Sequence, residues 1–111
     1  TWQKDNYFPE LKKLMDKDEI PIFQYVSFRR WHDPRSGLIS GVAPPRMSQG
    51  YTALQNRPGL LIETHMLKPY KIRVEATYHI IKNSAEILNK NYKELKRLVS
   101  DADQLVASQQ F

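Results

Sequence analysis

A single carboxylate interrupts an apolar run in the stretch GLLIETHM, residues 59–66. Burying an unpaired carboxylate is costly, so Glu63 is expected to be exposed, paired with a cation, or used in chemistry. The chemistry open to a lone glutamate is proton transfer, as a general base toward water or a general acid toward a leaving group. The alternative, from spacing alone, is a structural glutamate that faces solvent or pairs with a nearby arginine.

Arginines are concentrated in residues 29–57, where a single acid, Asp33, opposes them and lysine is absent; the whole chain has a net charge of +5. The arginines are Arg29, Arg30, Arg35, Arg46 and Arg57. Arginine binds carboxylate and phosphate groups through paired hydrogen bonds, so the set indicates an anionic partner. Any one of them alone is more simply explained as part of a solvated loop.

Metal-ligating side chains are few. The chain has no cysteine, and its three histidines are His32, His65 and His79. These three histidines are not at the spacing of a zinc ligand set. His65 lies two residues from Glu63 and therefore on the same face of a strand, either as its polar neighbour or as a packed or exposed histidine. His79 is expected on the surface of a helix.

Hydrophobic periodicity predicts the elements that would position Glu63. Residues 5–19 are expected to form a helix with Pro9 in its first turn, and residues 20–28 a strand. A long turn over 29–37 would connect that strand to a short return strand over 38–42, which makes a hairpin. Residues 41–58 are expected to be a functional or mobile loop with at most a helical turn in it, and 59–66 a central strand.

From Tyr70 onward the apolar period becomes helical. One stripe recurs at alternating spacings of three and four residues, and 89–91 is a candidate break. The stripe consists of Val74, Tyr78, Ile81, Ala85, Leu88, Tyr92, Leu95 and Val99. Its Ala and Tyr members favour packing against a sheet over a coiled coil. A second helix is expected over 100–111, capped by Ser100 or Asp101, and the fold class is therefore α/β.

The stretch GYTALQNRPGLLIETHMLKPYKIRV, residues 50–74, resembles the segment of the zinc carboxypeptidase family that carries the catalytic glutamate, in a bacterial branch of that family. The resemblance extends over about residues 20–99 and is dense between 44 and 74. It implies a mixed-sheet α/β zinc-peptidase domain, of which residues 1–99 would be the C-terminal part and 100–111 a helical tail. The parent enzyme would be secreted or periplasmic.

The resemblance also implies roles for particular residues. Glu63 would be the general base and then the general acid in hydrolysis of a peptide or amide bond next to a terminal carboxylate. Tyr51 would correspond to a tyrosine that covers the substrate, and Arg46 and Arg57 would be candidates to hold the substrate carboxylate. Zinc would be the cofactor, with ligands outside this segment, and the substrate a peptide or amino-acid amide.

Because the chain begins at Thr1 rather than at a methionine, we expect it to have been processed or excised from a longer polypeptide. Alone it is expected to be inactive, and to expose apolar surface through which it self-associates. The alternatives are a non-catalytic anion- or nucleic-acid-binding module, or an interaction domain that keeps the scaffold without metal. Nucleic acid is not the expected partner because the aromatic residues do not alternate with the basic ones. A membrane is not expected either, because no apolar run approaches the ~20 residues that a span needs.

Overall fold

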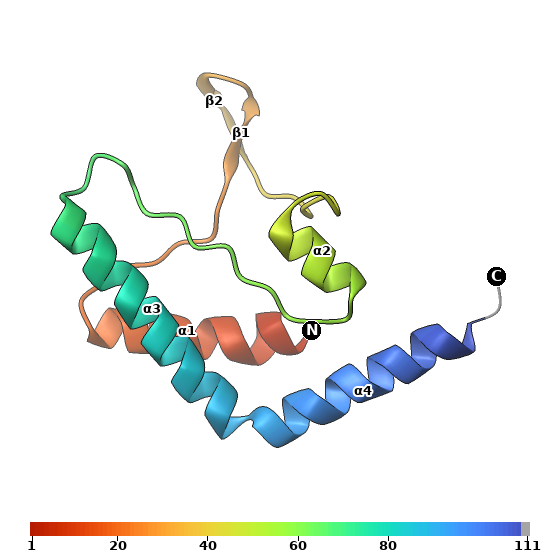
Figure 1. Cartoon of the computed structure of the whole chain (residues 1–111). Helices are drawn as coiled ribbons and strands as arrows, with labels where there is room; N and C mark the ends of the chain where they lie inside the picture. The colour runs from red at the N-terminus through yellow and green to blue at the C-terminus, as the bar shows by residue number, and fades with distance from the viewer. Residues whose placement is uncertain (110–111) are drawn as a thin grey trace.

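A computed structural model describes residues 1–109 of the chain (Figure 1). In chain order its elements are a π-helical turn η1 (Gln3–Tyr7), α1 (Phe8–Lys17), β1 (Ser27–Arg30), β2 (Asp33–Ile39), α2 (Ser48–Leu54), α3 (Tyr70–Lys90) and α4 (Tyr92–Ser108). Helices together with an antiparallel strand pair confirm the mixed α/β character in its coarse form. The last two residues of the expected C-terminal tail, 110–111, lie outside the described part.

The core lies between α1 and α3 and is small. The buried apolar side chains are Tyr7, Leu11, Met15 and Ile87. Leu11 and Met15 are four residues apart and therefore share one face of α1, while Ile87 meets them from α3. The hydroxyls of Tyr7 and Ser84 are hydrogen-bonded at 2.7 Å, which satisfies the polar end of the buried tyrosine. This contact joins the N-terminal region to the second half of the chain.

A polar cluster closes one end of the same interface. Asn83 is buried and donates from Nδ2 to Asp18 Oδ2 at 3.0 Å, and His79 Nδ1 lies 2.7 Å from the same oxygen. The hydrogen bond from Asn83, followed by that from His79, lowers the pKa of Asp18. The expectation of a surface histidine is wrong here, because His79 is only partly exposed and binds the end of α1.

The predicted apolar stripe of α3 is not the face that packs against α1. Asn83 and Ile87 are buried there, with Ile80 packed beside them. The stripe residues Ile81 and Leu88 instead border the irregular segment that follows α2. Helix α3 therefore has two apolar faces, one covered by α1 and one covered only in part.

The hairpin is present with different bounds. β1 starts at Ser27 rather than residue 20, and β2 covers most of the segment predicted as a turn. The turn itself is short, with Trp31 and His32 between the paired residues Arg30 and Asp33. Pro34 and Gly37 made this segment look like a turn, but the strand holds both. The register of the strand pair shifts between Phe28 and Arg30. This irregularity accommodates Pro34 and Gly37, which a regular ladder would disfavour.

A serine side chain replaces ladder bonds within this irregularity. Ser36 Oγ accepts a hydrogen bond from the Arg30 N–H at 2.8 Å and donates to the Asp33 carbonyl at 2.6 Å. Gly37 adopts a positive φ of 91°, which a residue with a side chain rarely does. The hairpin projects away from α1 and α3 (Figure 1).

The predicted strand over 59–66 is wrong as a ladder element. Residues 57–65 have no helical or strand assignment, and the only sheet in the described part is β1–β2. No backbone–backbone hydrogen bond is formed by residues 59–64 within residues 1–109. The loop predicted over 41–58 contains a full short helix, α2. Sequence composition found the apolar run but not the neighbours that a strand requires.

The helical C-terminal half follows the prediction up to the break. α3 ends at Lys90, Asn91 lies between the helices, and α4 begins at Tyr92. A separate helix that starts at residue 100 is wrong, since α4 continues unbroken to Ser108. None of the helices in residues 1–109 is long and apolar enough to cross a membrane.

The chain exposes more surface than a compact protein of its size. Its accessible area is 9462 Å², whereas a folded monomer of 13.1 kDa is expected to expose about 6,400 Å². The radius of gyration is 16.6 Å, compared with about 13 Å for a compact domain of this length. The excess of about 3,000 Å² is within the range that obligate interfaces bury. Large apolar side chains contribute to it, and Phe23 and Val42 are 88% and 98% exposed.

This excess predicts self-association of the isolated chain. In light scattering after size-exclusion chromatography, we expect a mass above the 13.1 kDa monomer that rises with protein concentration. Phe23→Ser should reduce the association, because it removes a ring that is 88% exposed and supports no core residue. A mass that stays at 13.1 kDa over a hundredfold concentration range would contradict the prediction.

The Asp18 cluster predicts a loss of stability in acid. The pKa of Asp18 in the folded chain lies below its ordinary value of 3.8, so the carboxylate stabilises the fold above that pH. This contribution is lost as the pH falls through the lowered pKa. Asp18→Asn should therefore melt at a lower temperature than the parent chain at pH 7, and the two melting temperatures should converge toward pH 3.

Asp101→Asn is the matched control for this experiment. It removes an exposed carboxylate paired with Arg97 on α4, far in sequence from the α1–α3 contact. Its melting temperature should follow that of the parent chain at every pH. If Asp18→Asn and the parent chain melt a constant interval apart from pH 7 to pH 3, the carboxylate of Asp18 is not the titrating group.

Candidate functional site

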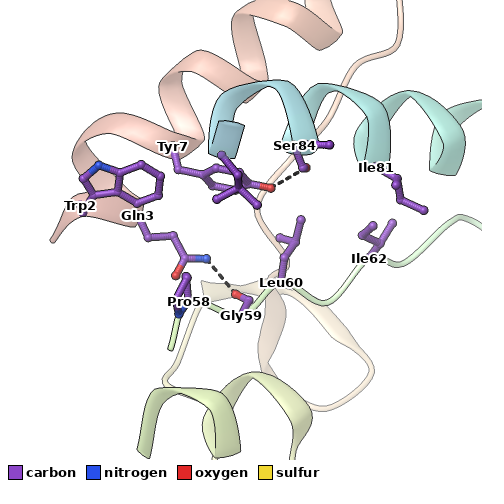
Figure 2. A pocket seen from close by; sticks show the side chains of 11 residues that line it. Trp2, Gln3, Tyr7, Pro58, Gly59, Leu60, Ile62, Ile81 and Ser84 are labelled. Carbon is purple, nitrogen blue, oxygen red and sulfur yellow. Dashed lines mark hydrogen bonds between the residues drawn. The ribbon is translucent and has the colours of Figure 1, made fainter. Parts of the chain in front are cut away.

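The segment around Glu63 runs beside α3 with strand-like alternation of its side chains. Leu60 and Ile62 point toward α3, where they line an apolar cavity of about 390 Å³ (Figure 2). Thr64 lines the next cavity along the same helix. Residues 60, 62 and 64 therefore share one side of the segment. Glu63 lines neither cavity, which puts it with Leu61 and His65 on the opposite side.

One hydrogen bond and one close packing contact hold the start of the segment in place. Gln3 donates from Nε2 to the Gly59 carbonyl at 2.8 Å (Figure 2), which connects the segment to η1. Trp2, Tyr7 and Pro58 close the cavity near this hydrogen bond. Gly59 itself packs so closely on Thr52 of α2 that a Cβ at this position would collide with the threonine side chain. The start of the segment is thus positioned by both η1 and α2.

Glu63 is exposed and uncommitted. Within residues 1–109 its carboxylate has no hydrogen bond and no ion pair. The structural alternative allowed Glu63 either to face solvent or to pair with an arginine such as Arg46 or Arg57, and the structure shows it exposed and paired with neither. A free carboxylate beside apolar residues can accept a proton from water or from a bound ligand.

His65 is also exposed and does not bind Glu63. Its Nδ1 accepts a hydrogen bond from the Leu67 N–H at 3.1 Å, in the turn that leads to α3. With Nδ1 engaged as an acceptor, the proton of the neutral ring is on Nε2. His65 therefore shapes the turn after Glu63 rather than orienting its carboxylate.

Tyr51 lies on α2 and is 60% exposed. The neighbouring Gly50 is buried, and a Cβ there would lie 2.6 Å from the Ala43 carbonyl oxygen and closer still to that of Pro44. Gly50 is therefore a close-packing residue that lets the chain before α2 fold back onto the helix. The hydroxyl of Tyr51 has no hydrogen bond within the described residues, and Tyr51 shares no cavity with Glu63.

The two arginines proposed for a substrate carboxylate differ in their environment. Arg57 makes a bidentate pair with Asp103 of α4, from Nη1 and Nη2 at 2.9 Å each, and Asn56 donates to the same carboxylate at 3.1 Å. The hydrogen bonds from Arg57 and then from Asn56 lower the pKa of Asp103. The hydrogen bond to Asp103 raises the pKa of Arg57. Arg46 is exposed and makes no ion pair in residues 1–109. Arg57 thus already has an internal carboxylate, whereas the guanidinium of Arg46 is open to solvent.

The residues present do not fit a zinc site. Across residues 1–109 there is no group of three or more His, Asp or Glu side chains arranged to hold a metal ion. His79 binds Asp18 between α1 and α3, and His65 binds backbone, so these two histidines are committed to different parts of the fold. A zinc ion implied by the resemblance would need ligands from sequence other than this.

Arg73 lies beside the Glu63 segment and was not predicted from the sequence as part of a site. Arg73 of α3 lines the same cavity as Thr64, and its buried Nε has no hydrogen-bond acceptor. A signal was available in the sequence. The residues three and four positions from Arg73 along the helix are not acidic, so the helix offers Arg73 no counter-ion. They are Pro69, Tyr70, Ala76 and Thr77.

Comparison of the chain with family models, curated proteins and solved structures gives no match.

The histidine geometry predicts weak zinc binding by the chain alone. In titration calorimetry with zinc chloride at neutral pH, we expect no one-to-one site of micromolar affinity, because no three ligands converge within residues 1–109. His65→Ala and His79→Ala should leave any weak signal unchanged. A stoichiometric micromolar site that either substitution removes would overturn the prediction.

Proposed function

We propose that this chain is the glutamate-bearing part of a zinc carboxypeptidase-type hydrolase that cleaves a peptide or amide bond next to a terminal carboxylate. Glu63 is the proposed proton-transfer residue. Such an enzyme takes its metal ligands from sequence other than these residues, and the chain alone is inactive.

The carrying observation is that the Glu63 carboxylate is exposed and unpaired in a segment anchored on one side only. Leu60 and Ile62 pack toward α3, which holds the backbone, while Glu63 is exposed and lines neither cavity beside the helix. A general base needs a defined position and a carboxylate that is not neutralised by an internal cation. The second condition holds here, because no internal cation pairs with Glu63 within residues 1–109, and the packing of Leu60 and Ile62 serves the first.

The remaining residues support the proposal unequally. The open guanidinium of Arg46 suits a substrate carboxylate better than that of Arg57, which is bound to Asp103. Tyr51 is exposed on α2 and has a free hydroxyl within the described part, as a substrate-covering tyrosine requires. Arg57 supports the fold instead, by joining the end of α2 to α4.

The proposal predicts the behaviour of Glu63→Gln in the complete enzyme that contains this chain. The amide keeps the size of the side chain but cannot take a proton from water, so hydrolysis should fall by about 10²–10⁴-fold or more. The melting temperature should stay unchanged, because Glu63 has no internal partner to lose within residues 1–109. Activity on a short peptide and a melting curve on the same sample check both expectations.

Glu86→Gln is the matched control for this substitution. Glu86 is an exposed glutamate of α3 whose contact is the surface residue Lys82, 4.0 Å away. It should retain full activity and stability. Normal hydrolysis by Glu63→Gln, or an equal loss in both variants, would reject the proposed role of Glu63.

A further inference from the structure

An open surface hollow of about 460 Å³ lies between the Glu63 segment and the first half of α3. It is lined by Thr64, Tyr70, Arg73, Val74, Thr77, Tyr78 and Ile81. Most of this surface is aliphatic or aromatic, and one guanidinium lies among it. An apolar cavity with a few polar groups is the usual form of a small-molecule site.

Arg73 is the charged group of this cavity, and the fold gives it no anion. Its Nε is buried and has no acceptor in residues 1–109, and its guanidinium carbon lies 5.8 Å from the centre of the Tyr70 ring. The nearest acid in sequence, Glu75, faces Lys71 at 3.6 Å on the exposed side of the helix. A buried donor without an acceptor is rare in native proteins, and it indicates a missing partner.

The hydroxyl groups of the cavity have unused hydrogen-bonding capacity. Thr77 Oγ1 donates to the Arg73 carbonyl at 2.9 Å, which holds the threonine against the arginine backbone. The hydroxyls of Thr64, Tyr70 and Tyr78 have no hydrogen bond within the described residues. These groups can donate to an anion that is already bound to Arg73.

We propose that this cavity is a binding site for a small anion, a carboxylate or phosphate group carried on a flat apolar body. The two-oxygen anion pairs with the guanidinium group of Arg73. The apolar body lies among Val74, Ile81 and the two tyrosine rings. The site does not depend on the proposed peptidase function, because Thr64 and Glu63 face opposite sides of the segment.

Titration of the ¹⁵N-labelled chain with benzoate, phenyl phosphate and benzamide tests this site by ¹H–¹⁵N correlation spectroscopy. Benzoate or phenyl phosphate should shift the amide signals of Thr64, Arg73 and Thr77 in a saturable way. Benzamide has the same shape without charge and should bind at least about tenfold more weakly. The tighter of the two anions identifies the source as a carboxylate or a phosphate.

Substitution of Arg73 separates a specific anion pair from general attraction to a basic chain. Arg73→Gln should weaken anion binding at least about tenfold, and Arg73→Lys several-fold, because a point charge replaces the fork. If Arg73→Gln does not fold, the lysine variant decides the question. Arg97→Gln, which removes an exposed arginine of α4, is the control and should bind as the parent chain does.

Three results would overturn the proposal. Equal affinity for benzamide and benzoate would mean that the cavity is merely apolar. Equal weakening by Arg97→Gln and Arg73→Gln would mean that net charge, not this site, attracts the anion. An affinity that neither Arg73 variant changes would place the bound anion elsewhere.

Discussion

The contact between α1 and α3 is the interaction on which the rest of the structure depends. Leu11 and Met15 face Ile87, the Tyr7 hydroxyl reaches Ser84, and the Asp18 cluster closes the far end. Because this contact uses only one face of α3, the orientation of the helix about its own axis is set by a few side chains. That orientation determines which apolar residues remain to cover the segment that carries Glu63. A change at the core would therefore be transmitted to Glu63 through the rotation of α3.

The orientation of α3 decides which side chains of the Glu63 segment are covered and leaves the Glu63 carboxylate exposed. Leu60 and Ile62 pack on the apolar face of α3 that α1 leaves free. Because successive side chains of an extended segment alternate in direction, Glu63 is then expected to point outward. A slip of one residue would exchange the two sides and direct the carboxylate at apolar atoms. The hydrogen bond from Gln3 to Gly59 and the close packing of Gly59 on Thr52 oppose such a slip at the start of the segment. The same alternation places Thr64 beside Arg73.

Local signals in the sequence were enough to predict the long helices and the presence of a hairpin. They did not predict the full length of α2, the bounds of β1 and β2, or the lack of ladder partners at 59–66 within the described residues. The 3.6-residue period located α3 and α4 and the break at Asn91, because helical hydrogen bonds are internal to the helix. A strand depends on neighbours distant in sequence. The apolar run at 59–66 predicted a central strand, and the structure has a segment without ladder partners there. The stripe on α3 was found, but a second apolar face that includes the polar Asn83 could not be recognised from apolar spacing. Within the candidate site, burial costs left Glu63 exposed, paired or used in chemistry, and the structure shows it exposed. The capture of Arg57 by Asp103 joins residues 46 positions apart and has no local signal.

Helix α4 is attached to the body by polar contacts rather than by a core. None of its residues is buried, and beyond the Asn91 junction it is held by the Arg57–Asp103 pair and by a bond from the Trp2 indole to Glu94 at 3.3 Å. Partly exposed ion pairs weaken as ions screen them, and the screening length falls from about 10 Å at 0.1 M salt to about 3 Å at 1 M. The attachment of α4 to the rest of the chain therefore depends on the salt concentration. At high ionic strength the pair between Arg57 and Asp103 is screened and holds α4 less firmly.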